Sequence, residues 1–206
     1  LLGKYVAFHN YRATISAEYE GFSDYTTEGA KPTTHYVPRF RNVFKQETDF
    51  LRGYAAGFQA TPIRYTPKEG IGENLKNNLL QTKETGIWNV GSHMMGETIP
   101  KESNMVTLDQ EKTDSWGIPL LNIDVDYDDN DEKMIQDFYE QFSEMYTKAG
   151  FSNIKVSDSN RRPGNDIHEM GGVRIGREPK TSLLNFIFLK DSISKERRGP
   201  MPLVNL

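Results

Sequence analysis

The stretch NDEKMIQDFYEQFSEMYTKA, residues 130–149, predicts the clearest helix of the chain. Its apolar side chains recur every three or four residues, a spacing that gathers them on one side of a helix. They are Met134, Phe138, Phe142, Met145, Tyr146 and Ala149. Asp131 and Glu132 fall in the first turn, where the helix dipole favours anions, and Gly150 suits a left-handed helix end. We therefore expect a helix that buries one side against a sheet.

The acidic run before this helix, residues 124–132, invites comparison with a calcium loop. An EF-hand loop needs glycine at its sixth position and glutamate at its twelfth. Counted from Asp124, these positions hold Asp129 and Ile135. The run instead predicts a strand end followed by a helix N-cap at Asp128 or Asp129. No metal site is expected in it.

Runs of β-branched and aromatic residues with partial alternation predict strands on both sides of the helix. They are residues 4–9, 12–19, 33–37, 53–60, 86–95, 104–109, 118–125 and 151–156. Residues 73–84 predict a second helix, with Leu75, Leu79 and Leu80 at helical spacing. This order of elements predicts an α+β fold: a mixed, largely antiparallel sheet with helices packed on one face.

Residues 70–75, GIGENL, begin like a dinucleotide-binding fingerprint. That motif needs a strand, a tight turn and a helix N-terminus to hold the pyrophosphate, and it carries a third glycine. Here the third glycine is missing, and Pro67, Lys68 and Glu69 precede the run in place of a strand. The run therefore predicts a loop that leads into the next helix.

Composition excludes several classes of protein. The 206 residues fit one large domain or one and a half, and an aromatic content of 11% argues against disorder. The absence of cysteine excludes disulfides, thiolate metal sites and cysteine nucleophiles. A net charge of -4 gives no reason to expect nucleic acid or an anionic membrane as a partner. No apolar run has the length of a membrane span, so we expect a soluble protein, cytoplasmic or periplasmic.

The stretch DIHEMGGVRIG, residues 166–176, is the strongest candidate for chemistry. The His168 imidazole can exchange a proton near neutral pH, and the glycines that follow allow close approach to a flat ligand. A zinc pair on a helix is excluded because Gly172 stands where the second histidine would be. Two interpretations remain: a proton-transfer site beside a cofactor, or an ordinary turn that carries a histidine. Composition alone favours the turn.

Residues 163–185, PGNDIHEMGGVRIGREPKTSLLN, strongly resemble the C-terminal signature of the glucose-methanol-choline (GMC) oxidoreductases. The likeness is greatest to the bacterial branch of sugar and polyol dehydrogenases related to pyranose oxidase. Further segments are similar to the same branch in the same order: residues 3–9, 36–42, 100–109 and 114–119. In the first of them, Ala7 and Phe8 replace the more usual methionine and aspartate.

The resemblance implies an enzyme that oxidises an alcohol carbon of a sugar or polyol with FAD. His168 falls on the family histidine that takes the hydroxyl proton while hydride moves to the flavin, which reverses the preference from composition alone. The residues that the resemblance places at the flavin are Gly171, Gly172, Arg174 and His9. It also places His93 toward the substrate.

The resemblance covers residues 1–185, which we expect to form the substrate domain, and it leaves residues 186–206 as a divergent, irregular tail. The family's FAD-binding half would precede residue 1, and its second catalytic histidine or asparagine would follow Asn185. We therefore expect a substrate-domain fragment that is inactive alone and that self-associates through its uncovered flavin-facing surface. The alternative is a non-catalytic carbohydrate-binding or interaction module.

Overall fold

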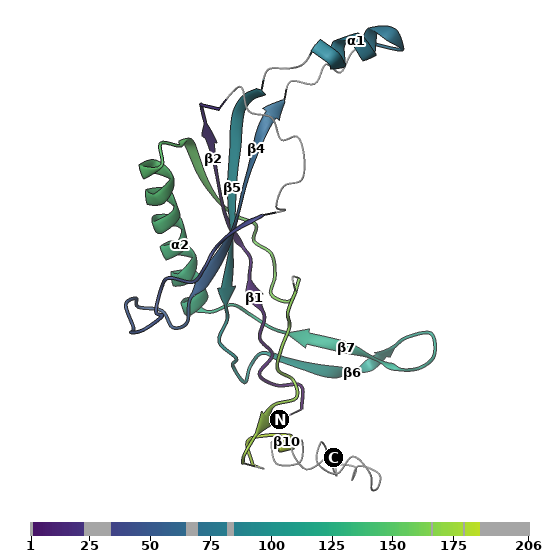
Figure 1. The fold of residues 1–206 in the computed structure, drawn as a ribbon. Helices are drawn as coiled ribbons and strands as arrows, with labels where there is room; N and C mark the ends of the chain where they lie inside the picture. Colours follow the sequence, from purple (N-terminus) through teal and green to yellow (C-terminus); the bar gives the residue numbers. More distant parts are fainter. Residues whose placement is uncertain are drawn as a thin grey trace, which may run out of the picture. The chain divides into compact units, whose positions relative to one another are not determined.

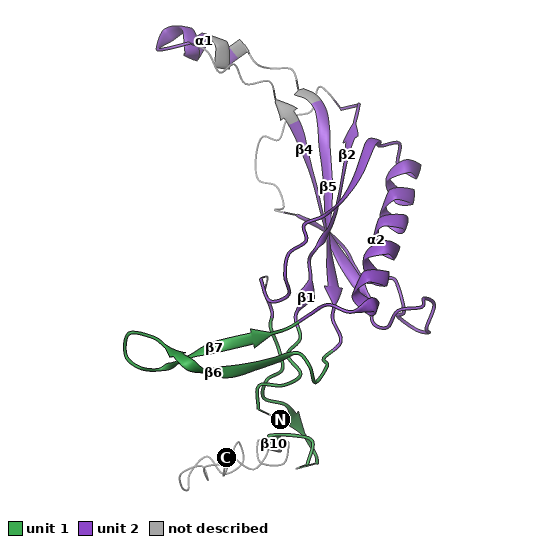
Figure 2. Ribbon diagram, turned by 180° about the vertical axis from the view of Figure 1, so that it is seen from behind, with its two compact units in different colours: residues 1–7, 100–125, 169–206 green, residues 8–99, 126–168 purple. Residues whose placement is uncertain are grey.

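The computed structural model describes residues 2–22, 34–64, 70–81, 85–165, 167–178 and 180–185. The chain divides into two compact units, coloured separately in Figure 2. Unit 1 comprises Leu1–Ala7, Pro100–Val125 and Glu169–Leu206, and unit 2 comprises Phe8–Ile99 and Asp126–His168. The substrate domain expected over residues 1–185 stays a prediction, and the expected tail, residues 186–206, lies outside the described residues.

Unit 2 is built on a six-stranded antiparallel sheet with the order β3-β4-β5-β2-β8, in which β1 also pairs with β5. The strands are β1 (His9–Asn10), β2 (Ala13–Tyr19), β3 (His35–Val37), β4 (Tyr54–Arg64), β5 (Thr85–Glu97) and β8 (Ser152–Asp158). A parallel pair in unit 1 makes the fold as a whole mixed. The predicted α+β class, with a largely antiparallel sheet, is confirmed.

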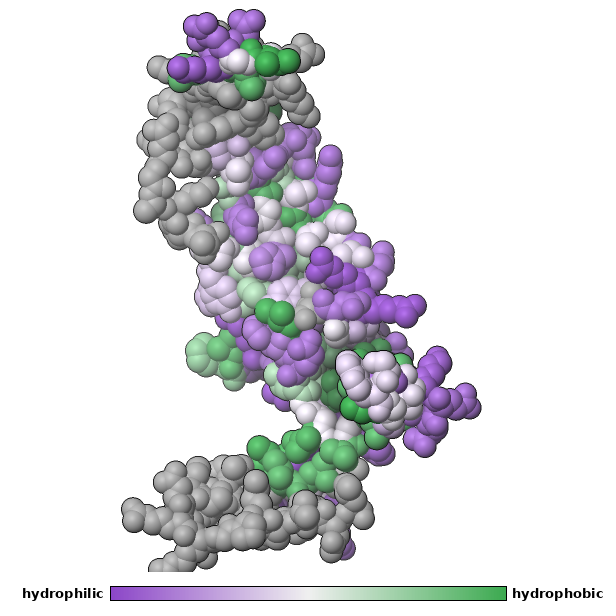
Figure 3. Space-filling view, turned by 90° about the vertical axis from the view of Figure 1, so that its right-hand side faces the viewer, coloured by the Kyte–Doolittle hydropathy of each residue, from purple (hydrophilic) through white to green (hydrophobic). Residues whose placement is uncertain are grey.

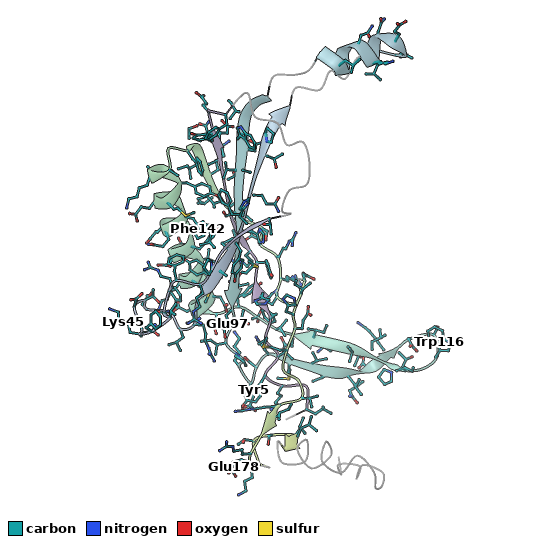
Figure 4. All side chains as sticks on the ribbon, in the orientation of Figure 1. Tyr5, Lys45, Glu97, Trp116, Phe142 and Glu178 are labelled. Atoms are coloured by element: carbon teal, nitrogen blue, oxygen red, sulfur yellow. The ribbon has the colours of Figure 1, made fainter. Side chains whose placement is uncertain are left out.

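Helix α2 (Asp129–Lys148) lies along one face of this sheet, and no described helix lies on the other face (Figure 1). Buried and exposed side chains alternate along the strands accordingly. In β2, Ala13, Ile15 and Ala17 are buried, whereas Ser16 between them is exposed. Most of the predicted apolar stripe of α2 forms the other half of the core, with Phe138, Phe142 and Tyr146 buried, whereas Met145 and Ala149 are exposed. Phe142 is labelled in Figure 4. Burial of each such ring contributes roughly 1.5–3 kcal/mol.

Both ends of α2 follow the sequence prediction. Asp128 is the N-cap, and a capping box links its side chain and backbone to Asp131. Gly150 takes a φ of +80°, as a left-handed helix end requires. The buried Tyr146 hydroxyl hydrogen-bonds with the Ser92 hydroxyl of β5 at 2.8 Å, which ties the helix to the sheet.

Two predictions for other segments need correction. Residues 4–9 were expected to form one strand, but Tyr5 has a φ of +60° and only isolated bridges occur at Lys4 and Ala7, so β1 begins at His9. Helix α1 (Glu73–Gln81) does not pack as a second layer on the sheet. It lies in the connection between β4 and β5, which pair directly with each other in antiparallel fashion.

Unit 1 contains a long hairpin of β6 (Met105–Thr113) and β7 (Pro119–Asp124), together with the short parallel pair β9 (Ile175–Gly176) and β10 (Leu184–Asn185). Asp114 caps the hairpin turn, and Trp116 is exposed at its tip (Figure 4). Several apolar residues of the chain are at the surface, and Figure 3 shows such residues in green. Among the described residues, no helix is long and apolar enough to cross a membrane.

Candidate active site

Four rings of unit 2 form a continuous series, which we call the ring ladder: His93, Tyr11, His9 and His168. The rings of His93 and Tyr11 are stacked, with centroids 6.1 Å apart and planes at 24°. Tyr11 meets His9 edge to face at 5.5 Å, and His9 meets His168 edge to face at 5.1 Å. Three histidines that lie far apart in the sequence are thereby brought together.

The ladder starts on the sheet face that α2 leaves uncovered. Side chains alternate along β5, and the neighbours of His93, Ser92 and Met94, are buried on the helix side. His93 therefore points to the opposite face. His93, Tyr11 and His9 are half-buried, whereas His168 at the end of the ladder is exposed. A solute can therefore approach the ladder from the His168 end.

The tautomer of His9 follows from its backbone partner. His9 Nδ1 lies 3.3 Å from the Gly96 carbonyl oxygen, which can only accept a hydrogen bond. In the neutral ring the proton is therefore on Nδ1, and Nε2 keeps its lone pair. This arrangement fixes the ring against β5 and leaves one nitrogen able to accept a proton or a hydrogen bond.

Gly57 provides the space that His93 occupies. The two residues are paired across β4 and β5. A Cβ atom at position 57 would lie 2.3 Å from Cε1 and 2.6 Å from Nε2 of His93. The imidazole therefore lies directly over the Gly57 backbone, and any side chain there would displace it.

His168 holds an unfavourable backbone conformation, with a φ of +67°. Residues other than glycine adopt this left-handed region at a cost of roughly 1–2 kcal/mol, and such conformations gather at functional sites. Asp166, two residues before it, lies outside the described residues.

The glycines after His168 belong to unit 1 and differ in what surrounds them. A Cβ at Gly171 would lie 1.9 Å from the Tyr5 carbonyl oxygen, so the close approach at Gly171 is to the chain's own backbone. At Gly172, with a φ of +70°, the nearest atom to such a Cβ is 4.0 Å away. A side chain at position 172 would therefore meet open space, although Gly172 itself is half-buried and Gly171 is exposed.

Arg174 is exposed, and its guanidinium lies over the Tyr5 ring at 5.5 Å. Its carbonyl oxygen accepts hydrogen bonds from the backbone N–H groups of Leu183 and Leu184 at 2.9 and 3.2 Å. The backbone of Arg174 thus holds the signature segment together, while its charge remains accessible to an anion.

The ring ladder includes one residue that sequence reasoning missed, Tyr11. A tyrosine in a strand-like run is most often a packing residue, so nothing singled it out. The available signal was its position two residues after His9, since alternate residues of an extended segment share one side. Among the described residues, no group of three His, Asp or Glu side chains could hold a metal ion.

Comparison with known proteins bears on this arrangement. Residues 100–186 match the GMC oxidoreductase family. The 2-methyl-1,2-propanediol dehydrogenase of Mycolicibacterium austroafricanum is 27% identical, over 90% of this chain and 34% of its own length. The chain thus spans about a third of the length of that relative. Both matches are to oxidoreductases, and the GMC match includes the signature segment with His168.

Residues 70–75 do not have the surroundings that the pyrophosphate of FAD requires. The fingerprint reading of residues 70–75 needs a βαβ unit with parallel strands, whereas α1 joins two strands that pair antiparallel. In unit 2, the half-buried imidazole of His9 is a group that a flat ring could contact.

Proposed function

We propose that this chain supplies the substrate side of an FAD-dependent oxidoreductase that acts on CH–OH groups of sugars or polyols. The single observation that carries the proposal is the contact between His9 and His168 at 5.1 Å, at the exposed end of the ring ladder. The GMC match and the name of the relative, a 1,2-diol dehydrogenase, support an alcohol as the substrate class.

In this proposal His168 is the base. Its exposed imidazole accepts the hydroxyl proton of the substrate, which requires a heavy-atom distance of about 2.6–3.2 Å between nitrogen and oxygen. We assign His9, Gly171, Gly172 and Arg174 to flavin binding by the resemblance. The resemblance also assigns His93 to the substrate, although in the ring ladder Tyr11 and His9 separate it from His168. The flavin, when bound, accepts the hydride.

Replacing His168 with alanine tests the role. In the full-length gene product supplied with FAD, His168→Ala should lower kcat on the order of 10²- to 10⁴-fold, because a general base contributes that much. Flavin absorbance should show that FAD is retained. His35, an exposed residue of β3 outside the ring ladder, provides the control: His35→Ala should leave turnover unchanged. Normal turnover by His168→Ala would contradict the proposal.

A non-catalytic carbohydrate-binding or interaction module is the second candidate. The antiparallel pairing of β4 and β5, which excludes a dinucleotide cradle at residues 70–75, is compatible with both candidates. Calorimetry on the 206-residue chain separates the two. The enzyme proposal expects little FAD binding, no dye reduction with sugars and no measurable sugar affinity by the chain alone. Affinity for a sugar without flavin would favour the binding module.

A further inference from the structure

His168 needs support from its surroundings. Its left-handed backbone conformation is unfavourable in isolation, so it persists only where neighbouring groups over-determine it. Within unit 2, the ring that meets the His168 ring is that of His9. The position of the candidate base therefore depends on what holds His9.

His9 is held on two sides. The Gly96 carbonyl oxygen fixes Nδ1, and the ring of Tyr11 packs against it edge to face. Tyr11 is in turn stacked on His93, and aromatic rings in edge-to-face and offset-stacked arrangements attract one another. The remaining member, His93, rests on the bare backbone of Gly57.

We propose that Tyr11 and Gly57 are positioning residues of the active site: Tyr11, seated on His93 over Gly57, holds His9 and through it the imidazole of His168. This inference rests on the proposed function for its catalytic consequence. The positioning itself is a property of unit 2 and can be measured without turnover.

The glycines of the sheet provide a matched pair of variants. Gly57→Ala places a methyl group 2.3 Å from His93 Cε1, whereas Gly91→Ala on the neighbouring strand meets only the Ile15 carbonyl oxygen, at 3.8 Å. Neither glycine has a positive φ, so alanine is compatible with the backbone at both sites. The two changes differ in whether the ladder must move.

Tyr11 provides a second pair of variants. Tyr11→Leu removes the ring between His9 and His93 but keeps an apolar side chain, and Tyr11→Phe keeps the ring. The chain has four histidines, so histidine-selective isotope labelling of the 206-residue chain gives few signals, and His35 reports on a site outside the ladder. Nuclear Overhauser effects between the rings of His9 and His168 report their contact directly.

The expected result is a selective change. Tyr11→Leu and Gly57→Ala should shift the His9 and His168 signals and weaken the nuclear Overhauser effect between the two rings. Tyr11→Phe and Gly91→Ala should leave the signals and the nuclear Overhauser effect as in the wild type. His35 should not respond to the Tyr11 variants. If Gly57→Ala does not fold, the comparison of Tyr11→Leu with Tyr11→Phe is sufficient to test the proposal. Unchanged His9 and His168 signals in Tyr11→Leu would overturn the proposal.

Turnover of the full-length gene product separates this inference from the proposed function. Tyr11→Leu should lower kcat on the order of 10- to 100-fold through misplacement of the base, with little change in KM, and Tyr11→Phe should restore it. If His168→Ala abolishes turnover but Tyr11→Leu does not lower it, the positioning role is wrong. If the histidine signals change as expected while His168→Ala is fully active, the positioning role of Tyr11 is supported and the proposed function is wrong.

Discussion

At the scale of single residues, Arg12 connects β8 and α2 through polar contacts. Its Nε donates to Asp158 Oδ1 at 3.1 Å, it pairs with Glu132 of α2, and its guanidinium lies 5.1 Å from the Tyr127 ring centroid. The hydrogen bonds from Arg12 lower the pKa of the Asp158 carboxyl, and partial burial opposes them. The same contacts raise the pKa of Arg12, whose charge is therefore fixed.

The shift at Asp158 predicts how stability depends on pH. Because the folded carboxyl has the lower pKa, its stabilising effect is full above the ordinary aspartate range and is lost as pH falls through the folded value. Asp158→Asn should therefore lower the free energy of unfolding at pH 7 by about 2 kcal/mol, as expected for a hydrogen bond to a charged group. It should also flatten the loss of stability in acid. Urea unfolding between pH 7 and pH 2 measures both.

Glu144 provides the comparison for that experiment. Its pairing with Lys148 one helical turn away also lowers its pKa, but the pair is exposed on the surface of α2. Exposed pairs contribute little because water and salt screen them. Glu144→Gln should leave the unfolding curve nearly unchanged at all pH values. An equal effect of the two variants would show that the lowered pKa of Asp158 does not report a stabilising contact.

At the scale of elements, the start of α2 gives a second prediction. The Asp128 side chain accepts from the Asn130 backbone N–H, and the Asp131 side chain accepts from the backbone N–H of Asp128. Asp128→Ala should therefore lower the free energy of unfolding by about 1 kcal/mol. Asp129→Ala should have a smaller effect, because the contact of Asp129 within the described part of the chain is an exposed ion pair with Lys133. Thermal unfolding followed by circular dichroism measures both, and equal losses would argue against Asp128 as the cap.

The elements that the sequence predicts are those whose signal is local. The stripe of α2, the alternation of β2 and the cap at Asp128 each depend on residues within a few positions of one another. The left-handed backbone of Tyr5 has no such local signal. On either side of it, Lys4 pairs with Met105 and Ala7 pairs with Met170, and both partners are far away in the sequence. For this reason, periodicity predicted a strand over residues 4–9 that runs through Tyr5.

The residues of the candidate site also differ in whether the sequence alone can identify them. The chemistry of imidazole and the resemblance of the signature single out His9, His93 and His168, and all three occur in the ring ladder. Tyr11 had only its position two residues after His9 as a signal, and the role of Gly57 depends on a contact across strands. A glycine in a strand predicts a close approach, but only the paired register of β4 and β5 shows that His93 is what approaches Gly57.

At the scale of the whole molecule, the β6–β7 hairpin of unit 1 bears on association. Register and alternation place Val106, Leu108, Leu121 and Ile123 on one side of the hairpin. Leu108, Leu121 and Ile123 are 55%, 64% and 61% exposed. A two-stranded hairpin is marginally stable unless another layer covers its apolar side, and exposed apolar patches mark interaction surfaces. The self-association expected through the flavin-facing surface stays a prediction, and this side of the hairpin is a further surface that we expect a second copy of the chain to cover at high concentration.

Exchanging leucine for threonine on this side tests the expectation. Threonine keeps the strand preference of the hairpin but replaces apolar area with a hydroxyl, so Leu108→Thr with Leu121→Thr should shift the association to higher concentration on the order of 10-fold or more. Sedimentation velocity over a concentration series measures the shift. Thr107→Ser with Asn122→Ser changes a paired position on the opposite side and should leave association as in the wild type. A wild-type chain that sediments as a monomer throughout would contradict self-association. Equal association of both double variants would move the contact away from this side of the hairpin.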